Sequence, residues 1–159
     1  LSQYKKSNDL AYTLACYSTE PFTLETPRDE LPNNACLSAE LTPASGPIGS
    51  KYYDSNPMFA ISVPKDGTII QLKLSTSKSE AVHALLVPVH SFGDKLRGSI
   101  GEAVINSGKY RHGFVLLRRQ KVGAGFYVLV ISRFCRTKTT CTAQVTISSS
   151  NPLKTMPIA

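Results

Sequence analysis

The stretch from Gly125 to Ile147 constrains the fold of this chain more than any other part of the sequence. Residues 141–147 alternate between apolar and polar side chains with a period of two, which is typical of a strand with one buried and one solvent-facing side. Residues 125–132 are bulky and apolar on both sides, which indicates a central strand that is covered above and below. We predict that the two strands form a hairpin whose bend spans residues 133–140.

The rest of the chain supplies further strand patterns that are separated by turn residues. They lie at residues 10–18, 20–24, 58–63, 68–74, 81–90 and 114–117. Pro64, Asp66 and Gly67 form a turn signal, because proline presets its φ and glycine permits the positive φ that follows. We find no amphipathic helix pattern. About seven or eight strand-like runs predict an all-β fold, an antiparallel β-sandwich of approximately eight strands.

The chain length and the positions of proline and glycine residues predict the domain organisation. A chain of 159 residues, 42% of them apolar, has enough material for one core. Residues 26–49 hold four prolines and two glycines without a sustained period, which indicates a linker or surface loop. We expect N-terminal strands at 1–27, a linker at 28–50, the sandwich at 51–150 and a C-terminal tail at 151–159. Because the chain begins at Leu1 and has no apolar run near ~20 residues, we also expect a soluble fragment of a longer protein.

The charge is distributed unevenly along the chain. The net charge is +7, and residues 103–159 hold nine Lys/Arg and no Asp/Glu. This asymmetry suggests an anionic partner. The candidate anion-binding or partner-binding residues are Lys109, Arg111, Arg118, Arg119, Lys121, Arg133, Arg136 and Lys138.

Three interpretations of these basic residues stay open, and a fourth is disfavoured. They are either solvated side chains that discourage edge-to-edge pairing of strands, contacts for an acidic protein segment, or contacts for an anionic membrane. The groups 118–121 and 133–138 flank opposite ends of the predicted hairpin, so we do not expect them to share one face. Nucleic acid is the least favoured partner, because no exposed aromatic platform interleaves with the charges.

The remaining reactive residues do not form a catalytic or metal-binding pattern. The four cysteines are Cys16, Cys36, Cys135 and Cys141. They are either free, buried thiols or disulfide-bonded, and one possible disulfide joins Cys135 to Cys141. The histidines, His83, His90 and His112, lie in or beside strands, and no cysteine begins a helix, so we expect no catalysis in this chain. Single aspartates in separate turns (Asp54, Asp66 and Asp94) predict no calcium site, and we expect no cofactor.

Two motifs near the ends of the predicted sandwich carry a family resemblance. Asn56-Pro57-Met58-Phe59 opens one strand, and Ser132-Arg133-Phe134 follows the strand of residues 124–132. With the strands between them, these motifs resemble domain III of calpains over residues 46–150. The usual upstream Trp and Gly-Gly are missing, and residues 43–49 stand in their place. In this respect the chain more nearly resembles the PalB-type calpain-like proteases of the fungal ambient-pH pathway.

The resemblance implies a function and a set of partners. It implies a non-catalytic interaction and regulatory domain of a calpain-like cysteine endopeptidase that processes a transcription factor. The implied partners are the protease core, the substrate transcription factor and endosomal sorting-complex components, in the cytoplasm with recruitment to endosomal membranes. Residues 10–24 then either close a preceding sandwich copy or fold with this sandwich. The alternative function is a stand-alone basic β-sandwich that docks on anionic membrane lipid.

Overall fold

The computed structural model describes residues 17–21, 23, 30–97, 100–135 and 138–158. The chain divides into two compact units, Leu1–Glu30 and Leu31–Ala159. Most of the strand predicted at residues 10–18, and part of the one predicted at 20–24, lie outside the described residues. No helix in the described part of the chain is long and apolar enough to cross a membrane.

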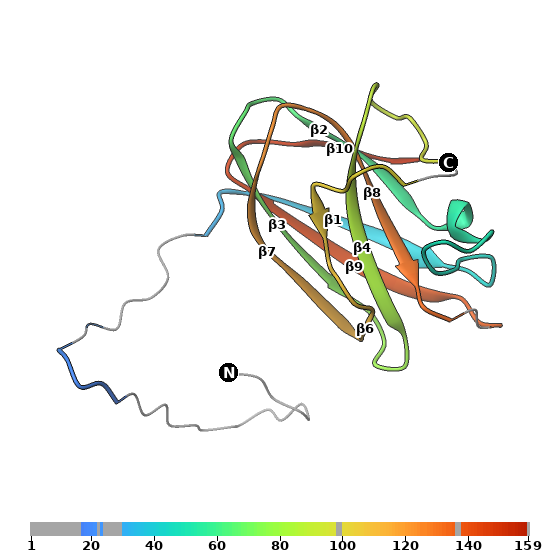
Figure 1. Ribbon diagram of the computed structural model, residues 1–159, viewed down its shortest axis with the longest axis horizontal. Helices are drawn as coiled ribbons and strands as arrows, with labels where there is room; N and C mark the ends of the chain where they lie inside the picture. The colour runs from blue at the N-terminus through green and yellow to red at the C-terminus, as the bar shows by residue number, and fades with distance from the viewer. Residues whose placement is uncertain (1–16, 22, 24–29, 98–99, 136–137, 159) are drawn as a thin grey trace. The chain divides into compact units, whose positions relative to one another are not determined.

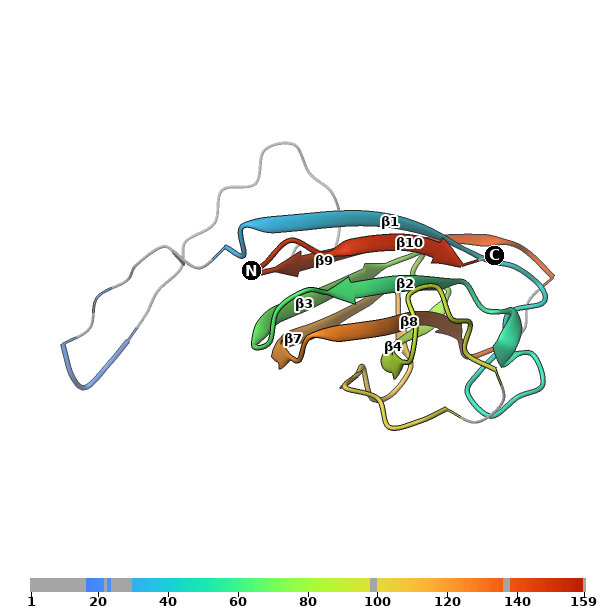
Figure 2. The same cartoon turned by 90° about the horizontal axis from the view of Figure 1, so that it is seen from above.

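The unit Leu31–Ala159 is a sandwich of two antiparallel sheets (Figure 1), which confirms the predicted fold class. The four-stranded sheet has the order β1 (Asn33–Leu41), β9 (Cys141–Ser149), β3 (Thr68–Ser75) and β7 (Phe114–Val122). The six-stranded sheet has the order β10 (Lys154–Ile158), β2 (Met58–Val63), β8 (Gly125–Arg133), β4 (Ala81–Val89) and β5 (Ile105–Asn106), and β6 (Arg111–His112) also pairs with β4. A short 3-10 helix, η1 (Tyr53–Ser55), precedes β2. Figure 2 shows these strands from above.

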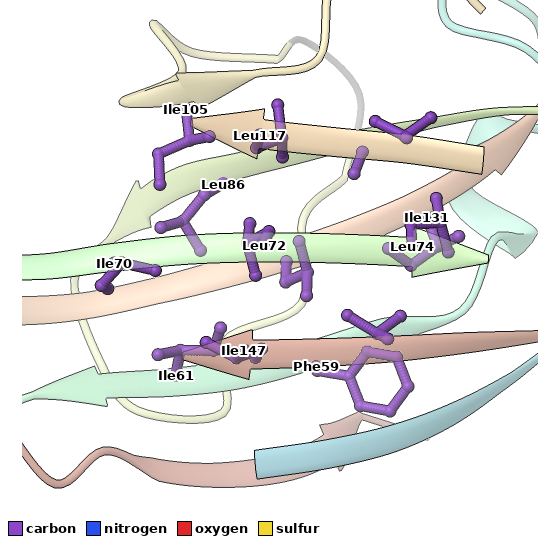
Figure 3. Packing of buried hydrophobic residues seen from close by; sticks show 14 of the residues in the cluster. Phe59, Ile61, Ile70, Leu72, Leu74, Leu86, Ile105, Leu117, Ile131 and Ile147 are labelled. Carbon is purple, nitrogen blue, oxygen red and sulfur yellow. The ribbon is translucent and has the colours of Figure 1, made fainter. Parts of the chain in front are cut away.

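The main core lies between the two sheets. The long strands of both sheets contribute alternate residues, as their period of two predicts: Ile70, Leu72 and Leu74 of β3 are all at most 2% exposed. Figure 3 shows these side chains among those of the opposite sheet, which include Phe59, Ile61, Leu86 and Ile131. Full burial of one such side chain contributes about 1.5–3 kcal/mol, so this cluster provides most of the favourable free energy of folding.

A second, smaller core covers the outer face of the six-stranded sheet. Val128 and Val130 of β8 and Leu85 of β4 are buried there with Tyr53 of η1. Partly buried residues of the segment after β4, including Ile100, pack on the same cluster. The segments before β2 and after β4 therefore form an additional layer over this sheet. This layer confirms that β8 is a central strand covered on both sides.

The predicted hairpin of residues 125–147 is wrong. Its two strands exist, but β8 belongs to the six-stranded sheet and β9 to the four-stranded sheet, where β9 pairs with β1 and β3. The segment from 134 to 140 therefore crosses from one sheet to the other. The physical reason is that β8 is apolar on both sides and needs packed side chains against each of them, whereas one side of β9 is polar and faces solvent.

Two strands occur where the sequence predicted irregular structure. Residues 33–41 of the expected linker form β1, whose inward side chains include Ala39 and Leu41. Residues 154–158 of the expected tail form β10, which pairs with β2. Both strands lie at sheet edges, and they carry Asn, Ser, Glu, Lys or Pro instead of a continuous run of strong strand formers. Their neighbours, rather than their own propensity, stabilise them.

The turns and cysteines agree with the predictions only in part. Gly67 has φ +72°, as the turn signal at residues 64–67 predicted. Cys36, Cys135 and Cys141 are free thiols, so no Cys135–Cys141 disulfide forms. The expectation that the thiols are buried is wrong for Cys36 and Cys135, which are exposed. Cys16 lies outside the described residues.

Candidate partner-binding surfaces

The basic residues singled out in the sequence divide between the two sheets. Arg118, Arg119 and Lys121 lie on β7 of the four-stranded sheet, whereas Arg111 lies on β6, which pairs with the six-stranded sheet. Lys109 and Lys138 are exposed in connecting segments, and Arg136 lies outside the described residues. The net charge of +7 is therefore spread over more than one surface.

Arg133 is not available to a partner, which corrects its prediction as an anion-binding residue. Its side chain is 0% exposed, and its Nη2 lies 2.5 Å from Oε1 of Glu80. Its Nη1 donates hydrogen bonds to the carbonyl oxygens of Leu41 (3.1 Å), Thr42 (3.3 Å) and Thr139 (3.1 Å). Position 133 continues the inward face of β8, where a guanidinium is tolerated only with a charged partner and hydrogen-bond acceptors.

The outer face of the four-stranded sheet carries one exposed basic surface, which we call the β7 face. It consists of Lys73, Phe114, Leu116, Arg118, Arg119 and Lys121. Leu116 is paired with Lys73 across the strands, and Nζ of Lys73 lies 5.8 Å from the ring centroid of Phe114. Phe114 is 44% and Leu116 is 51% exposed. The β7 face thus combines apolar side chains with cations, a combination that suits an anionic surface.

A second surface is a pocket of about 410 Å³, which we call the Tyr110 pocket. It is lined by Ala81, Lys109, Tyr110, His112 and Phe134. Only Lys109 belongs to the basic set that the sequence singled out. Tyr110 was missed. Phe134 was noticed only as part of the Ser132-Arg133-Phe134 motif, so that motif and the charge of Lys109 were the sequence signals that pointed to the pocket.

Tyr110 is held in place from several sides. Its hydroxyl oxygen accepts a hydrogen bond from the Ile48 backbone N–H (2.9 Å) and lies 3.0 Å from Oγ of Ser132. Its ring centroid lies 5.0 Å from that of His83 and 5.4 Å from that of Phe134. These contacts connect the pocket to the loop before β2, to β4 and to β8.

His83 serves as a buried support behind Tyr110. It is 1% exposed, and burial lowers the pKa of its imidazole, although the hydrogen bond to Asn106 opposes this shift. Oδ1 of Asn106 accepts from the Gly108 N–H (2.7 Å), so we assign Nε2 of His83 as a donor to the same oxygen (3.0 Å). Gly108 has φ +77°, which permits the turn that leads into Lys109. The neutral imidazole therefore stabilises the pocket.

Asn56 of the Asn-Pro motif anchors the loop beside this pocket. Its Nδ2 donates to the carbonyl oxygens of Gly46 (2.8 Å) and Tyr53 (2.9 Å), and its Oδ1 accepts from the Gly46 N–H (3.2 Å). Gly46 is required because a Cβ there would lie 2.7 Å from Cβ of Tyr52. The motif behind the family resemblance thus shapes the segment that donates to Tyr110 through Ile48.

Asp66 and Asp94 accept hydrogen bonds from backbone amides in turns. Oδ1 of Asp66 accepts from the Ala124 N–H (2.6 Å), and Oδ2 of Asp94 accepts from the Ser91 N–H (2.8 Å). Asp54 lies in η1. Among the residues that the structure describes, no group of three or more His, Cys, Asp or Glu side chains is arranged to hold a metal ion.

Comparison with known proteins finds distant relatives over most of the chain. No family model matches. The chain is 28% identical to calpain-7 of Mus musculus and 27% identical to calpain-7 of Homo sapiens, each over 141 residues and 84% of this chain. It is 28% identical to the calpain-like protease palB/RIM13 of Aspergillus oryzae over 151 residues, 92% of this chain.

The chain spans about a sixth of the length of these relatives: 16% of each calpain-7 and 17% of palB/RIM13. Distant similarity to calpain-like proteases is therefore established. The identities do not distinguish the fungal relative from the animal ones, so the closer resemblance to PalB-type proteases stays a prediction.

Proposed function

We propose that this chain is a non-catalytic interaction and regulatory domain of a calpain-like cysteine protease that acts in fungal ambient-pH signalling. In this proposal the protease processes a transcription factor. The observation that carries the proposal is the similarity to calpain-7 and palB/RIM13, which covers 84% to 92% of the chain but only about a sixth of each relative.

The arrangement of potential nucleophiles supports a non-catalytic role. A cysteine protease needs a thiolate beside a histidine base in a cleft that substrate can enter. Cys36 and Cys135 are exposed thiols, whereas His83 is buried and hydrogen-bonded to Asn106. The structural roles of Asn56 and Arg133 also support a scaffold, because both side chains are used to hold segments of the sandwich together.

The proposal extends to partners and location. We propose the protease core, the substrate transcription factor and endosomal sorting-complex components as partners, and a cytoplasmic location with recruitment to endosomal membranes. We further propose that residues 1–27 are the end of a preceding sandwich copy. The Tyr110 pocket and the β7 face are the surfaces on which such partners would act.

A deletion within the intact gene product tests this function. We expect removal of residues 31–159 to abolish processing of the transcription factor in cells at every ambient pH, because the protease loses its docking domain. Hydrolysis of a short fluorogenic peptide by the purified protease should remain. Processing that continues unchanged after the deletion would refute the proposal, and loss of peptide hydrolysis would assign the domain to the catalytic machinery instead.

The β7 face favours a second candidate function, docking on anionic lipid. Its four cations share the sheet face with Phe114 and Leu116, which are exposed and apolar enough to enter a headgroup layer. A basic residue close to an anionic membrane contributes about 1 kcal/mol, and this attraction weakens as salt screens it.

Vesicle flotation tests the lipid function. We expect the chain to float with phosphatidylserine vesicles at low salt, and the double substitution Arg118→Gln with Lys121→Gln to weaken binding by ~2 kcal/mol, about 30-fold. Lys109→Gln, which changes the other surface, should bind as the parent chain does. Equal binding to neutral vesicles, or binding that persists in 0.5 M salt (about a 4 Å screening length), contradicts this function.

A further inference from the structure

The Tyr110 pocket presents an aromatic pair that is exposed and yet fixed in position. Phe134 is 56% exposed, and its backbone N–H donates to the Ala81 carbonyl oxygen (2.9 Å). Its ring packs 5.4 Å from Tyr110, whose hydroxyl is held by Ile48 and Ser132. A large apolar side chain that is already ordered loses little conformational freedom when a partner binds, which is a property of energetic hot spots in interfaces.

The charge around the pocket determines what the pocket selects. Lys109 and His112 line it, and none of its five lining residues is acidic. Glu80, which immediately precedes Ala81, is paired with Arg133 in the interior and does not offset this charge. Since residues 103–159 contain no Asp or Glu, the exposed chain leading to and from the pocket is cationic or neutral. The complementary ligand is acidic.

The size of the pocket and its aromatic lining further restrict which ligands can bind there. About 410 Å³ accommodates one large side chain with part of its backbone, and the aromatic rings of Tyr110 and Phe134 favour an apolar or aromatic group. Lys109 at the rim favours a carboxylate beside that group.

We propose that the Tyr110 pocket binds an acidic linear segment of a partner protein. One aromatic or large aliphatic side chain of the segment packs against Tyr110 and Phe134, and flanking carboxylates pair with Lys109. This inference rests on the proposed interaction role and names the site and the chemistry of the partner. It is independent of the β7 face, which lies on the other sheet.

Peptide titration of the isotopically labelled full chain tests the proposal. The probe is Ac-Asp-Glu-Asp-Phe-Glu-Asp-NH2, and the control peptides replace Phe by Ala, or every acid by Lys. We expect amide shift changes centred on Lys109, Tyr110 and Phe134. The Phe-to-Ala peptide should bind at least about tenfold more weakly, and the lysine peptide should not bind.

Matched variants locate the binding site. Phe134→Ala and Lys109→Glu should each weaken binding of the probe by about tenfold or more. Phe114→Ala and Lys121→Glu, which make the same changes on the β7 face, should alter it by less than about twofold. Because all four substituted side chains are exposed, each variant should fold and retain the dispersed amide spectrum of the parent chain.

Several results would overturn the proposal. These are the absence of shift changes up to about 1 mM probe, shift changes confined to the β7 face, or equal binding by folded Phe134→Ala and the parent chain. If single-stranded nucleic acid or anionic vesicles change the amide shifts of the pocket residues and the probe does not, the pocket binds nucleic acid or lipid instead. Failure here leaves the deletion experiment on processing unaffected, so the two proposals are tested separately.

Discussion

Arg133 joins the two sheets through one buried side chain. It projects from the end of β8 in the six-stranded sheet and donates to the Leu41 carbonyl oxygen at the end of β1 in the four-stranded sheet. The carboxylate of Glu80 balances the charge of Arg133, and Nε of Arg133 also donates a hydrogen bond to Oε2 of Glu80 (3.2 Å). A buried ion pair of this kind is strongly destabilising when one partner is removed, whatever its net contribution when intact.

We therefore expect Arg133→Ala to lower the free energy of unfolding by about 3–5 kcal/mol, because it leaves the Glu80 carboxylate and three carbonyl oxygens without their donor. Urea unfolding of the two proteins measures the difference. The exposed Arg118→Ala is the matched control and should change stability by less than about 0.5 kcal/mol. A loss below about 1 kcal/mol for Arg133→Ala would show that this cluster does not stabilise the sandwich.

Asn56 has a comparable role in the loop before β2. Asn56→Ala removes three hydrogen bonds to Gly46 and Tyr53, and we expect it to cost about 2–3 kcal/mol at ~1 kcal/mol for each bond. Urea unfolding, extrapolated to zero denaturant, measures the loss in the free energy of unfolding. Asn56→Asp should not rescue stability, since a carboxylate would face the carbonyl oxygens of Gly46 and Tyr53. Full stability of the Asp variant would contradict these assigned contacts.

At the scale of the elements, β10 protects an edge of the six-stranded sheet. Its residues 154–158 pair with all but one residue of β2, and Ile158 packs on the second core. Without β10, the apolar β2 would become an edge strand with unpaired backbone groups. Exposed apolar edges of this kind promote pairing between molecules.

Truncation after Ser150 should lower the free energy of unfolding by about 3 kcal/mol and cause association that depends on protein concentration. Thermal unfolding and analytical ultracentrifugation measure the two effects. Met156→Thr changes a side chain that is 41% exposed and preserves the strand, so this control should associate no more than the parent and be nearly as stable. A truncated chain that is equally stable and associates no more than the parent would show that β10 is dispensable.

At the scale of the whole molecule, the two outer faces of the sandwich differ in kind. The four-stranded sheet leaves the β7 face open, whereas loops and η1 cover much of the six-stranded sheet and leave the Tyr110 pocket at one end of β4. The basic second half of the chain therefore supplies two separate surfaces. Each surface requires its own charge substitutions to be tested.

The stability of the whole molecule should depend on pH through His83. Burial lowers its pKa below 6.5, so the unfolded chain binds the proton more readily than the folded chain does. The free energy of unfolding should therefore fall as the pH decreases below about 6.5. Urea unfolding at several pH values measures this slope, which His83→Gln should reduce. An unchanged slope in that variant would exclude His83 as its source.

The sequence predicted a large part of this fold because strong strand formers alternate regularly. Strands were expected at residues 58–63, 68–74, 81–90 and 114–117, and β2, β3, β4 and β7 occur there, with β7 extending further to Val122. β1 and β10 escaped prediction because edge strands tolerate weak strand formers and depend on the strand beside them. For the pocket, charge pointed to Lys109, whereas no local pattern linked Tyr110 to Phe134.

By itself the sequence determined the all-β class, the buried face of each strongly patterned strand and the basic character of the second half, because these properties follow from side-chain type and spacing. Only the tertiary structure decided that β8 and β9 separate into different sheets, that Arg133 is buried against Glu80, and that Tyr110 meets Phe134. These outcomes depend on contacts between segments far apart in the chain. Such contacts are selected by the packing of both sheets together and leave no periodic signature in either segment alone.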